Sequence, residues 1–149
     1  AGGGVRHQRG ARLRGGLTAD DKGGVPRRRR PDPAAGRAAL AAWRAAPDDV
    51  STPDRRAAVR FTLEELADVA PGNAVEVRVP PDGAVQAVAG PRHTRGTPPN
   101  VVETDAQTWL ALATGSLRWA DAMAAGRVHA SGERADLSEW LPLQAARPR

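Results

Sequence analysis

The sequence has no cysteine, tyrosine or isoleucine, and only one phenylalanine, one methionine and one lysine. Without cysteine, a disulfide framework, a cysteine-ligated zinc site and thiol catalysis are excluded for this chain. Residues with GC-rich codons (Ala, Gly, Arg, Pro and Val) are abundant instead, which is typical of a high-GC bacterium. The preference for arginine over lysine is therefore interpreted as codon pressure rather than as bidentate recognition.

Long apolar runs are also missing, and none approaches the ~20 residues that a membrane-spanning helix requires. The arginine residues near the N-terminus are not followed by an apolar stretch, so no secretory signal is predicted. We expect a cytoplasmic protein.

The net charge of +5 is unevenly distributed. Residues 1–30 carry a net charge of +7, whereas residues 31–149 carry −2. Because the basic excess belongs to the N-terminal segment, we expect no specific nucleic-acid partner for the folded part. The Arg27–Arg30 run predicts a weak contact with an anionic membrane or, less strongly, with nucleic acid, and the alternative is a solvated tail.

Residues 1–33 are rich in glycine and arginine and show no apolar periodicity, so they are predicted to be disordered. Val25 follows Lys22-Gly23-Gly24, which fits a ribosome-binding site read through as protein. We therefore hypothesise that translation starts at Val25 and that residues 1–24 are upstream sequence. Residues 34–149 are predicted to form a single domain.

Two helices are predicted at the start of this domain. Asp32 and Pro33 suit the cap and first turn of a helix over Ala34–Ala46, on which Leu40 and Trp43 share a face. A second helix begins at residues 51–53 and stops at Pro71-Gly72. Its apolar positions recur at helical spacing: Val59, Leu63, Leu66 and Ala70.

The pattern then alternates with the period of a strand. Ala74–Val79 and Ala84–Ala89 are predicted to form a hairpin around the turn at Pro80–Gly83. Gly90–Pro99 is a polar loop, and a short strand at Asn100–Glu103 follows.

The rest of the chain returns to helical spacing. One helix carries Trp109 and Leu112 and closes at Gly115, and a second runs from Ser116 to Gly126. Arg127–Ser131 alternates again as a strand. Together these elements predict an α+β fold, with an antiparallel sheet of about four strands covered by helices.

Three segments have the spacing of a helix-capping box. Thr62–Glu65 would cap a shorter version of the second helix, and Thr104–Gln107 would cap the helix that carries Trp109. Asp136–Glu139 predicts a last short helix, which would bear three apolar residues: Leu137, Trp140 and Leu141.

The order of elements from Val75 onward resembles the second half of sterol carrier protein domains. That family shows a strand, an Asp that starts a short helix ending in Gly, a second helix ending in Gly, and a strand ending in Gly. The matching segments here are Val101–Thr104, Asp105–Gly115, Leu117–Gly126 and Arg127–Gly132.

Three further segments, Val75–Pro81, His93–Asn100 and Leu141–Leu143, resemble the bacterial branch of this family. The resemblance covers residues 55–143. It implies an apolar cavity between the helices and the sheet that holds a lipid or an acyl chain. The same fold occurs as an accessory domain beside thiol-dependent isomerases and acetyltransferases, so fold alone does not determine function.

Few residues are candidates for catalysis. His129 alternates with apolar neighbours and is predicted to be an exposed or hydrogen-bonded strand residue. Glu103 and Asp105 form a close carboxylate pair, but Asp105 is better explained as a helix cap. No phosphate-binding loop, metal-binding histidine pair or nucleophile elbow is found, so we expect no enzyme, metal or cofactor.

We instead expect a noncatalytic binding module for a lipid, fatty-acyl or sterol-like molecule. His93 and Arg95, in the polar loop, would hold a head group, although a purely structural loop is the alternative. The alternative for the whole domain is a structural or protein-interaction role with a filled core. The candidate lining residues are each also explicable as ordinary core: Trp109, Leu112, Leu117, Trp119, Met123, Trp140 and Leu141.

Overall fold

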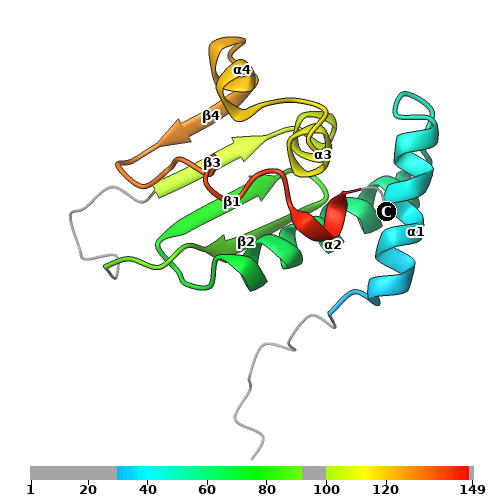
Figure 1. Cartoon of the computed structure of the whole chain (residues 1–149), viewed down its shortest axis with the longest axis horizontal. Coiled ribbons are helices and arrows are strands. Elements are labelled where there is room, and N and C mark those ends of the chain that lie inside the picture. The colour runs from blue at the N-terminus through cyan, green and yellow to red at the C-terminus, as the bar shows by residue number, and fades with distance from the viewer. Residues whose placement is uncertain (1–29, 92–99, 148–149) are drawn as a thin grey trace, which may run out of the picture.

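The computed structural model describes residues 30–91 and 100–147, which form the predicted α+β fold (Figure 1). The elements follow in the order α1 (Pro33–Ala45), α2 (Thr52–Val69), β1 (Val75–Val79), β2 (Gly83–Ala87), β3 (Asn100–Thr104), α3 (Ala106–Thr114), α4 (Trp119–Ala124), β4 (Val128–Ser131) and a 3₁₀ helix, η1 (Gln144–Ala146). None of the helices in these two ranges is long and apolar enough to cross a membrane.

The strands lie in the order β2-β1-β3-β4 (Figure 1). The β1–β2 hairpin is antiparallel, as predicted, and so is the β3–β4 pair. The four-stranded sheet is therefore mostly antiparallel, as predicted, but the sequence did not reveal that β1 and β3 are parallel. The chain after β2 places β3 on the far side of β1, and alternation along a strand is the same for either direction of pairing.

One face of the sheet is buried and the other is polar, as the alternation predicted. The three valines of β1 and Val102 of β3 are at most 1% exposed. On the opposite face, Arg78 Nε lies 2.7 Å from Glu76 Oε1, and Arg78 Nη1 lies 3.9 Å from Glu103 Oε2. His129 is exposed and lies opposite Glu103 in the register, which confirms its predicted exposure.

Helices α1 and α2 begin where their capping residues predicted. The Asp32 carboxylate accepts a hydrogen bond from the Ala34 N–H, and Ser51 Oγ accepts one from Asp54. The two helices pack against each other where Gly36 meets Phe61, because a Cβ at Gly36 would lie only 2.4 Å from the Phe61 ring.

The interpretation of Thr62 as a helix cap was wrong, since Thr62 lies in the middle of α2. Its hydroxyl donates to the Ala58 carbonyl at 2.8 Å and accepts a 2.8 Å hydrogen bond from the indole Nε1–H of Trp109. Both residues are completely buried. This contact joins α2 to α3 through the core.

The other two capping boxes were also misread. Thr104 belongs to β3, where its hydroxyl donates to the Arg127 carbonyl, and Asp105 is the cap of α3. The predicted last short helix does not form. Residues 138–140 make a turn instead, in which the Asp136 carboxylate accepts a hydrogen bond from the Ser138 N–H.

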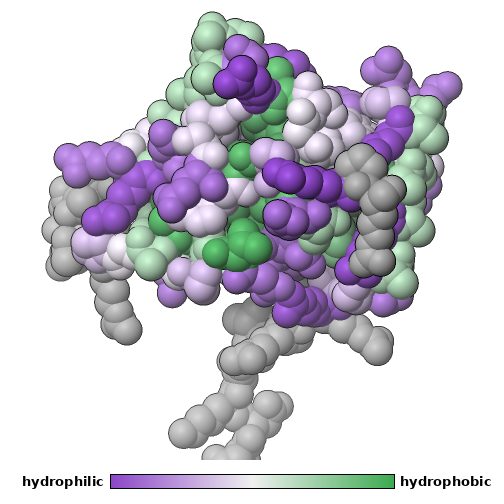
Figure 2. All heavy atoms as spheres, viewed as in Figure 1, coloured by the Kyte–Doolittle hydropathy of each residue, from purple (hydrophilic) through white to green (hydrophobic). Residues whose placement is uncertain are grey.

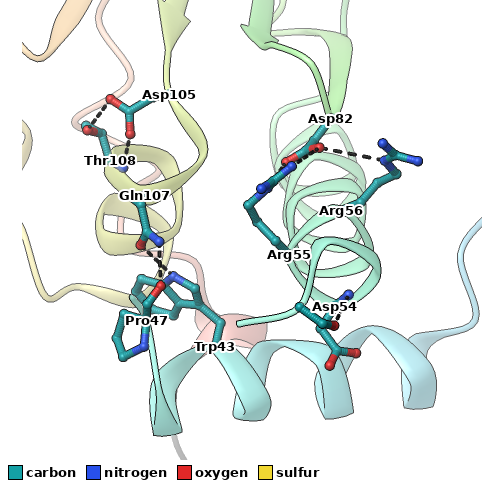
Figure 3. Close-up of polar contacts among 10 residues, drawn as sticks. Trp43, Pro47, Asp54, Arg55, Arg56, Asp82, Asp105, Gln107 and Thr108 are labelled. Carbon is teal, nitrogen blue, oxygen red and sulfur yellow. Dashed lines mark hydrogen bonds and ion pairs between the residues drawn. The ribbon is translucent and has the colours of Figure 1, made fainter. Parts of the chain in front are cut away.

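Polar contacts also tie the helices to one another and to the hairpin (Figure 3). Gln107 of α3 accepts a 2.9 Å hydrogen bond from Trp43 Nε1 of α1. At the hairpin turn, the fully buried Asp82 carboxylate lies between Arg55 and Arg56 of α2, at 2.8 Å and 3.7 Å. The bidentate hydrogen bond from Arg55 to Asp82 raises the pKa of the guanidinium.

We predict that Thr62→Val lowers the free energy of unfolding by about 2 kcal/mol, because it leaves the Trp109 N–H buried without an acceptor. In a Trp109→Phe background, the same change should cost less than about 0.5 kcal/mol, since no donor remains to be satisfied. Urea unfolding of the four variants measures both values. An equal cost in the two backgrounds would contradict the proposed role of the hydrogen bond.

We also predict that Asp82→Ala costs about 2 kcal/mol or more, because it removes the buried carboxylate that both arginines face. The cost stays below that of a fully buried pair because the Arg55 side chain is 27% exposed and reaches water. Arg56→Gln is the control and should cost less than about 0.5 kcal/mol, because that side chain is half exposed. Thermal or urea unfolding would show whether Asp82→Ala loses more stability than Arg56→Gln.

Candidate functional site

A pocket of about 310 Å³ opens beside the α3–α4 turn. It lies between the C-terminal end of α3, the start of α4 and the chain segment that follows β4. The residues that line it are Leu112, Gly115, Leu117, Arg118, Trp119, Ala120, Ser138, Leu141 and Pro142. None of them belongs to a strand, so this pocket is not the predicted cavity between helices and sheet.

The start of α3 is determined by Asp105. Its carboxylate accepts hydrogen bonds at 2.8 Å from both the backbone N–H and the hydroxyl of Thr108 (Figure 3). Burial raises the pKa of Asp105, but the hydrogen bonds from Thr108 and the nearby charge of Arg127 outweigh it, so the net pKa is lowered. The cap thereby orients the helix whose last turn carries Leu112.

The end of α3 is determined by Gly115, as the sequence predicted. Gly115 adopts a left-handed conformation with φ +89°, which glycine adopts without steric cost. The N–H groups of Gly115 and Leu117 both donate to the Ala111 carbonyl, and this turns the chain back toward α3. Leu117 therefore packs against the core beside the pocket instead of extending into water.

The chain segment that follows β4 forms the third side of the pocket, after the end of α3 and the start of α4. The Leu143 N–H donates to the Ala113 carbonyl at 2.9 Å, which holds this segment against α3. The Pro142 ring would lie 3.3 Å from a Cβ built at Gly115. Gly115 therefore serves both the backbone turn and the close approach of Pro142.

The pocket is apolar inside and polar at its edge. Leu112 is only 1% exposed, and Leu117, Trp119 and Leu141 are half-buried. Arg118 and Ser138 are exposed and supply the polar side chains of the lining. On the face of the molecule shown in Figure 2, hydrophobic residues form small areas separated by hydrophilic ones.

Four of the candidate lining residues lie together in this pocket: Leu112, Leu117, Trp119 and Leu141. Three others lie elsewhere. Trp109 is a core residue bonded to Thr62, Met123 is 39% exposed on α4, and Trp140 is half-buried outside the lining. His93 and Arg95 lie outside the described residues.

Sequence reasoning missed five lining residues as parts of the site: Gly115, Arg118, Ala120, Ser138 and Pro142. Arg118 had a signal, since it stands between Leu117 and Trp119, three residues after the glycine stop at Gly115. The prediction that Ser116 opens α4 was wrong. The helix begins at Trp119, and this leaves Leu117 and Arg118 in the turn that borders the pocket.

The basic N-terminal run contributes one described residue. Arg30 forms an exposed ion pair with Asp68 of α2, whereas Arg27–Arg29 lie outside the described part of the chain. The same part of the chain shows no cluster of histidine and carboxylate side chains suited to a metal ion.

The comparison with known families decides the classification. The profile described as bacterial SCP ortholog, where SCP denotes sterol carrier protein, matches residues 51–143. The chain belongs to this family. The match begins at the Ser51 cap of α2 and includes the whole sheet and every lining residue of the pocket. The search of curated proteins found none that matches the chain.

Membership of the SCP ortholog family agrees with the resemblance predicted over residues 55–143. The backbone conformation explains the glycine stops quoted for that resemblance. Gly115, Gly126 and Gly132 all have positive φ, a conformation that side chains rarely adopt.

We predict that Asp105→Ala lowers the free energy of unfolding by about 1 kcal/mol at pH 7, because α3 loses its N-cap. Since the folded pKa of Asp105 is lowered below its ordinary value of 3.8, the carboxylate stabilises the fold above the unfolded pKa. That stabilisation is lost as the pH falls through the folded pKa. Urea unfolding at pH 7 and near pH 2.5 should therefore show that the difference in unfolding free energy between Asp105→Ala and wild type is smaller at the acidic pH. The control is Asp48→Ala, which changes an exposed loop carboxylate. If the difference between Asp105→Ala and wild type widened in acid, the assignment of Asp105 as the helix cap would be contradicted.

Proposed function

We propose that the chain is a noncatalytic binding module for a hydrophobic small molecule, which it holds in the pocket beside the α3–α4 turn. The observation that carries the proposal is the convergence of four predicted apolar lining residues on one pocket of about 310 Å³. Family membership supports it, since the family is that of sterol carrier proteins. Pockets for small molecules have this character, being mainly apolar with a few polar groups.

The mechanism is sequestration. The apolar part of the ligand displaces water from Leu112, Leu117 and Leu141 and gains about 25 cal/mol for each Å² of apolar surface removed from water. Trp119 adds an aromatic surface to the lining. No proton transfer or covalent step is needed. The head-group role of His93 and Arg95 stays a prediction.

A second candidate is a protein-interaction domain whose interior is filled by its own side chains. The observation that favours it is the packing between helices and sheet, where Trp109, Leu110 and the valines of β1 are completely buried. Trp109 also has its indole N–H bonded within the core. In that case the pocket beside α4 would be a surface depression without a ligand.

A titration of ¹⁵N-labelled protein with 1-octanol, followed by amide chemical shifts, separates the two functions. A ligand of about ten non-hydrogen atoms at about 0.4 kcal/mol each gives about −4 kcal/mol, which corresponds to a Kd near 1 mM. We expect saturable shifts centred on Gly115–Ala120 and on residues 138–142. Small unsaturated shifts spread over the whole surface would support the interaction domain.

The matched variants are Ala120→Trp and Ala124→Trp. Both replace an exposed alanine of α4, but only Ala120 lines the pocket. Filling the pocket with the new indole should weaken 1-octanol binding at least about tenfold, whereas Ala124→Trp should leave it within about twofold. Equal effects of the two changes would place the ligand elsewhere.

A further inference from the structure

We propose that the pocket selects a small monocarboxylate amphiphile, whose apolar body lies against Leu112 and Leu117 and whose carboxylate pairs with Arg118. This inference rests on the proposed function and adds the size and charge of the ligand. It depends on three properties of the site: its volume, the sign of its charge and the state of the arginine.

The volume limits the size of the ligand. A water molecule in the liquid occupies about 30 Å³, so a pocket of about 310 Å³ holds roughly ten non-hydrogen atoms. This lies at the small end of the range for ligand pockets, about 300–1,000 Å³. A sterol is far larger, whereas octanoate or a small aromatic acid matches the space.

The lining carries charge of one sign. Arg118 is its one ionisable residue, and the other eight lining residues are apolar, glycine or serine. A cation inside this pocket would meet an arginine, and no carboxylate belongs to the lining. An anion would meet a guanidinium and the Ser138 hydroxyl at the exposed edge, while its apolar part faces the leucines.

Arg118 also has no side-chain interaction partner among the described residues. Arg55, Arg56 and Arg78 each face a carboxylate, but no ion pair or side-chain hydrogen bond within residues 30–91 and 100–147 involves Arg118. It stands at the N-cap position of α4, where its side chain forms no capping bond. Residues with capping side chains hold that position at α1, α2 and α3.

The guanidinium of arginine favours a carboxylate because its planar N–H groups match the two oxygens in a bidentate pair. Since Arg118 is exposed, its contribution should be modest, and salt should screen it. The apolar contacts would supply most of the affinity, and the charge would determine which end of the ligand faces water.

The test compares octanoate, 1-octanol and octyltrimethylammonium on the full chain at pH 7, by the same amide shifts. We expect octanoate to bind about fivefold more tightly than 1-octanol, and the cation to bind most weakly. Arg118→Gln should remove the advantage of octanoate over 1-octanol. Arg37→Gln, which changes an exposed arginine of α1 outside the lining, should leave all three affinities unchanged.

Chain length tests the volume. From hexanoate to octanoate the affinity should rise about threefold per methylene, since each is buried. Beyond decanoate it should stay flat, because further methylenes extend into water. An affinity that keeps rising through hexadecanoate would overturn the size limit.

The outcomes distinguish the two proposals. If 1-octanol binds at the pocket but octanoate binds no more tightly, or if Arg118→Gln weakens both equally, the carboxylate assignment is overturned and the proposed function stands. If neither ligand gives saturable shifts at the lining residues, the proposed function fails together with the inference.

Discussion

The hydrogen bond between Trp109 and Thr62 is the contact around which the helices and the sheet are organised. Trp109 is the largest fully buried side chain, and its indole carries a donor that water cannot reach. Thr62 supplies the acceptor from the middle of α2, at 2.8 Å. Because an unsatisfied donor in the core is costly, α3 must lie against α2 in one orientation and at one position along the α2 axis. Helix α2 in turn packs against β2 of the sheet, so it joins the sheet to the helix that carries both the indole and the pocket residue Leu112.

The pocket follows from this arrangement. Once α3 is oriented by Trp109 and by the Asp105 cap, its end at Gly115 has a determined position. The left-handed turn brings Leu117 back toward the core. The hydrogen bond from the Leu143 N–H to the Ala113 carbonyl brings the C-terminal segment to the same place. Three chain segments then meet around a space that their side chains do not fill. Small residues at Gly115 and Ala120 help to keep it open.

The relation of this pocket to the family is informative. The whole site lies within the residues that match the bacterial SCP ortholog profile. In this chain the valines and leucines between helices and sheet are tightly buried. The pocket lies instead at the periphery, beside α4. A peripheral site of limited volume is consistent with a smaller ligand than a sterol, and its exposed arginine is consistent with a charged one.

The sequence alone determined the local features of this protein. Asp32 and Ser51 predicted the helix starts because a carboxylate or hydroxyl satisfies free N–H groups next to it in the chain, and Gly115 predicted a helix end because a left-handed turn needs glycine. Alternation in β1 predicted which side chains are buried, since it depends only on the pleat of one strand.

Tertiary structure decided what depends on neighbours distant in sequence. The parallel pairing of β1 with β3, the burial of Thr62 under Trp109 and the separation of Trp109 from Leu117 and Leu141 arise from packing between elements. Helical spacing places an apolar residue on the inner side of its helix, but it does not distinguish a side chain that fills the core from one that borders a cavity. That distinction depends on how closely the other segments approach, which only the folded chain determines.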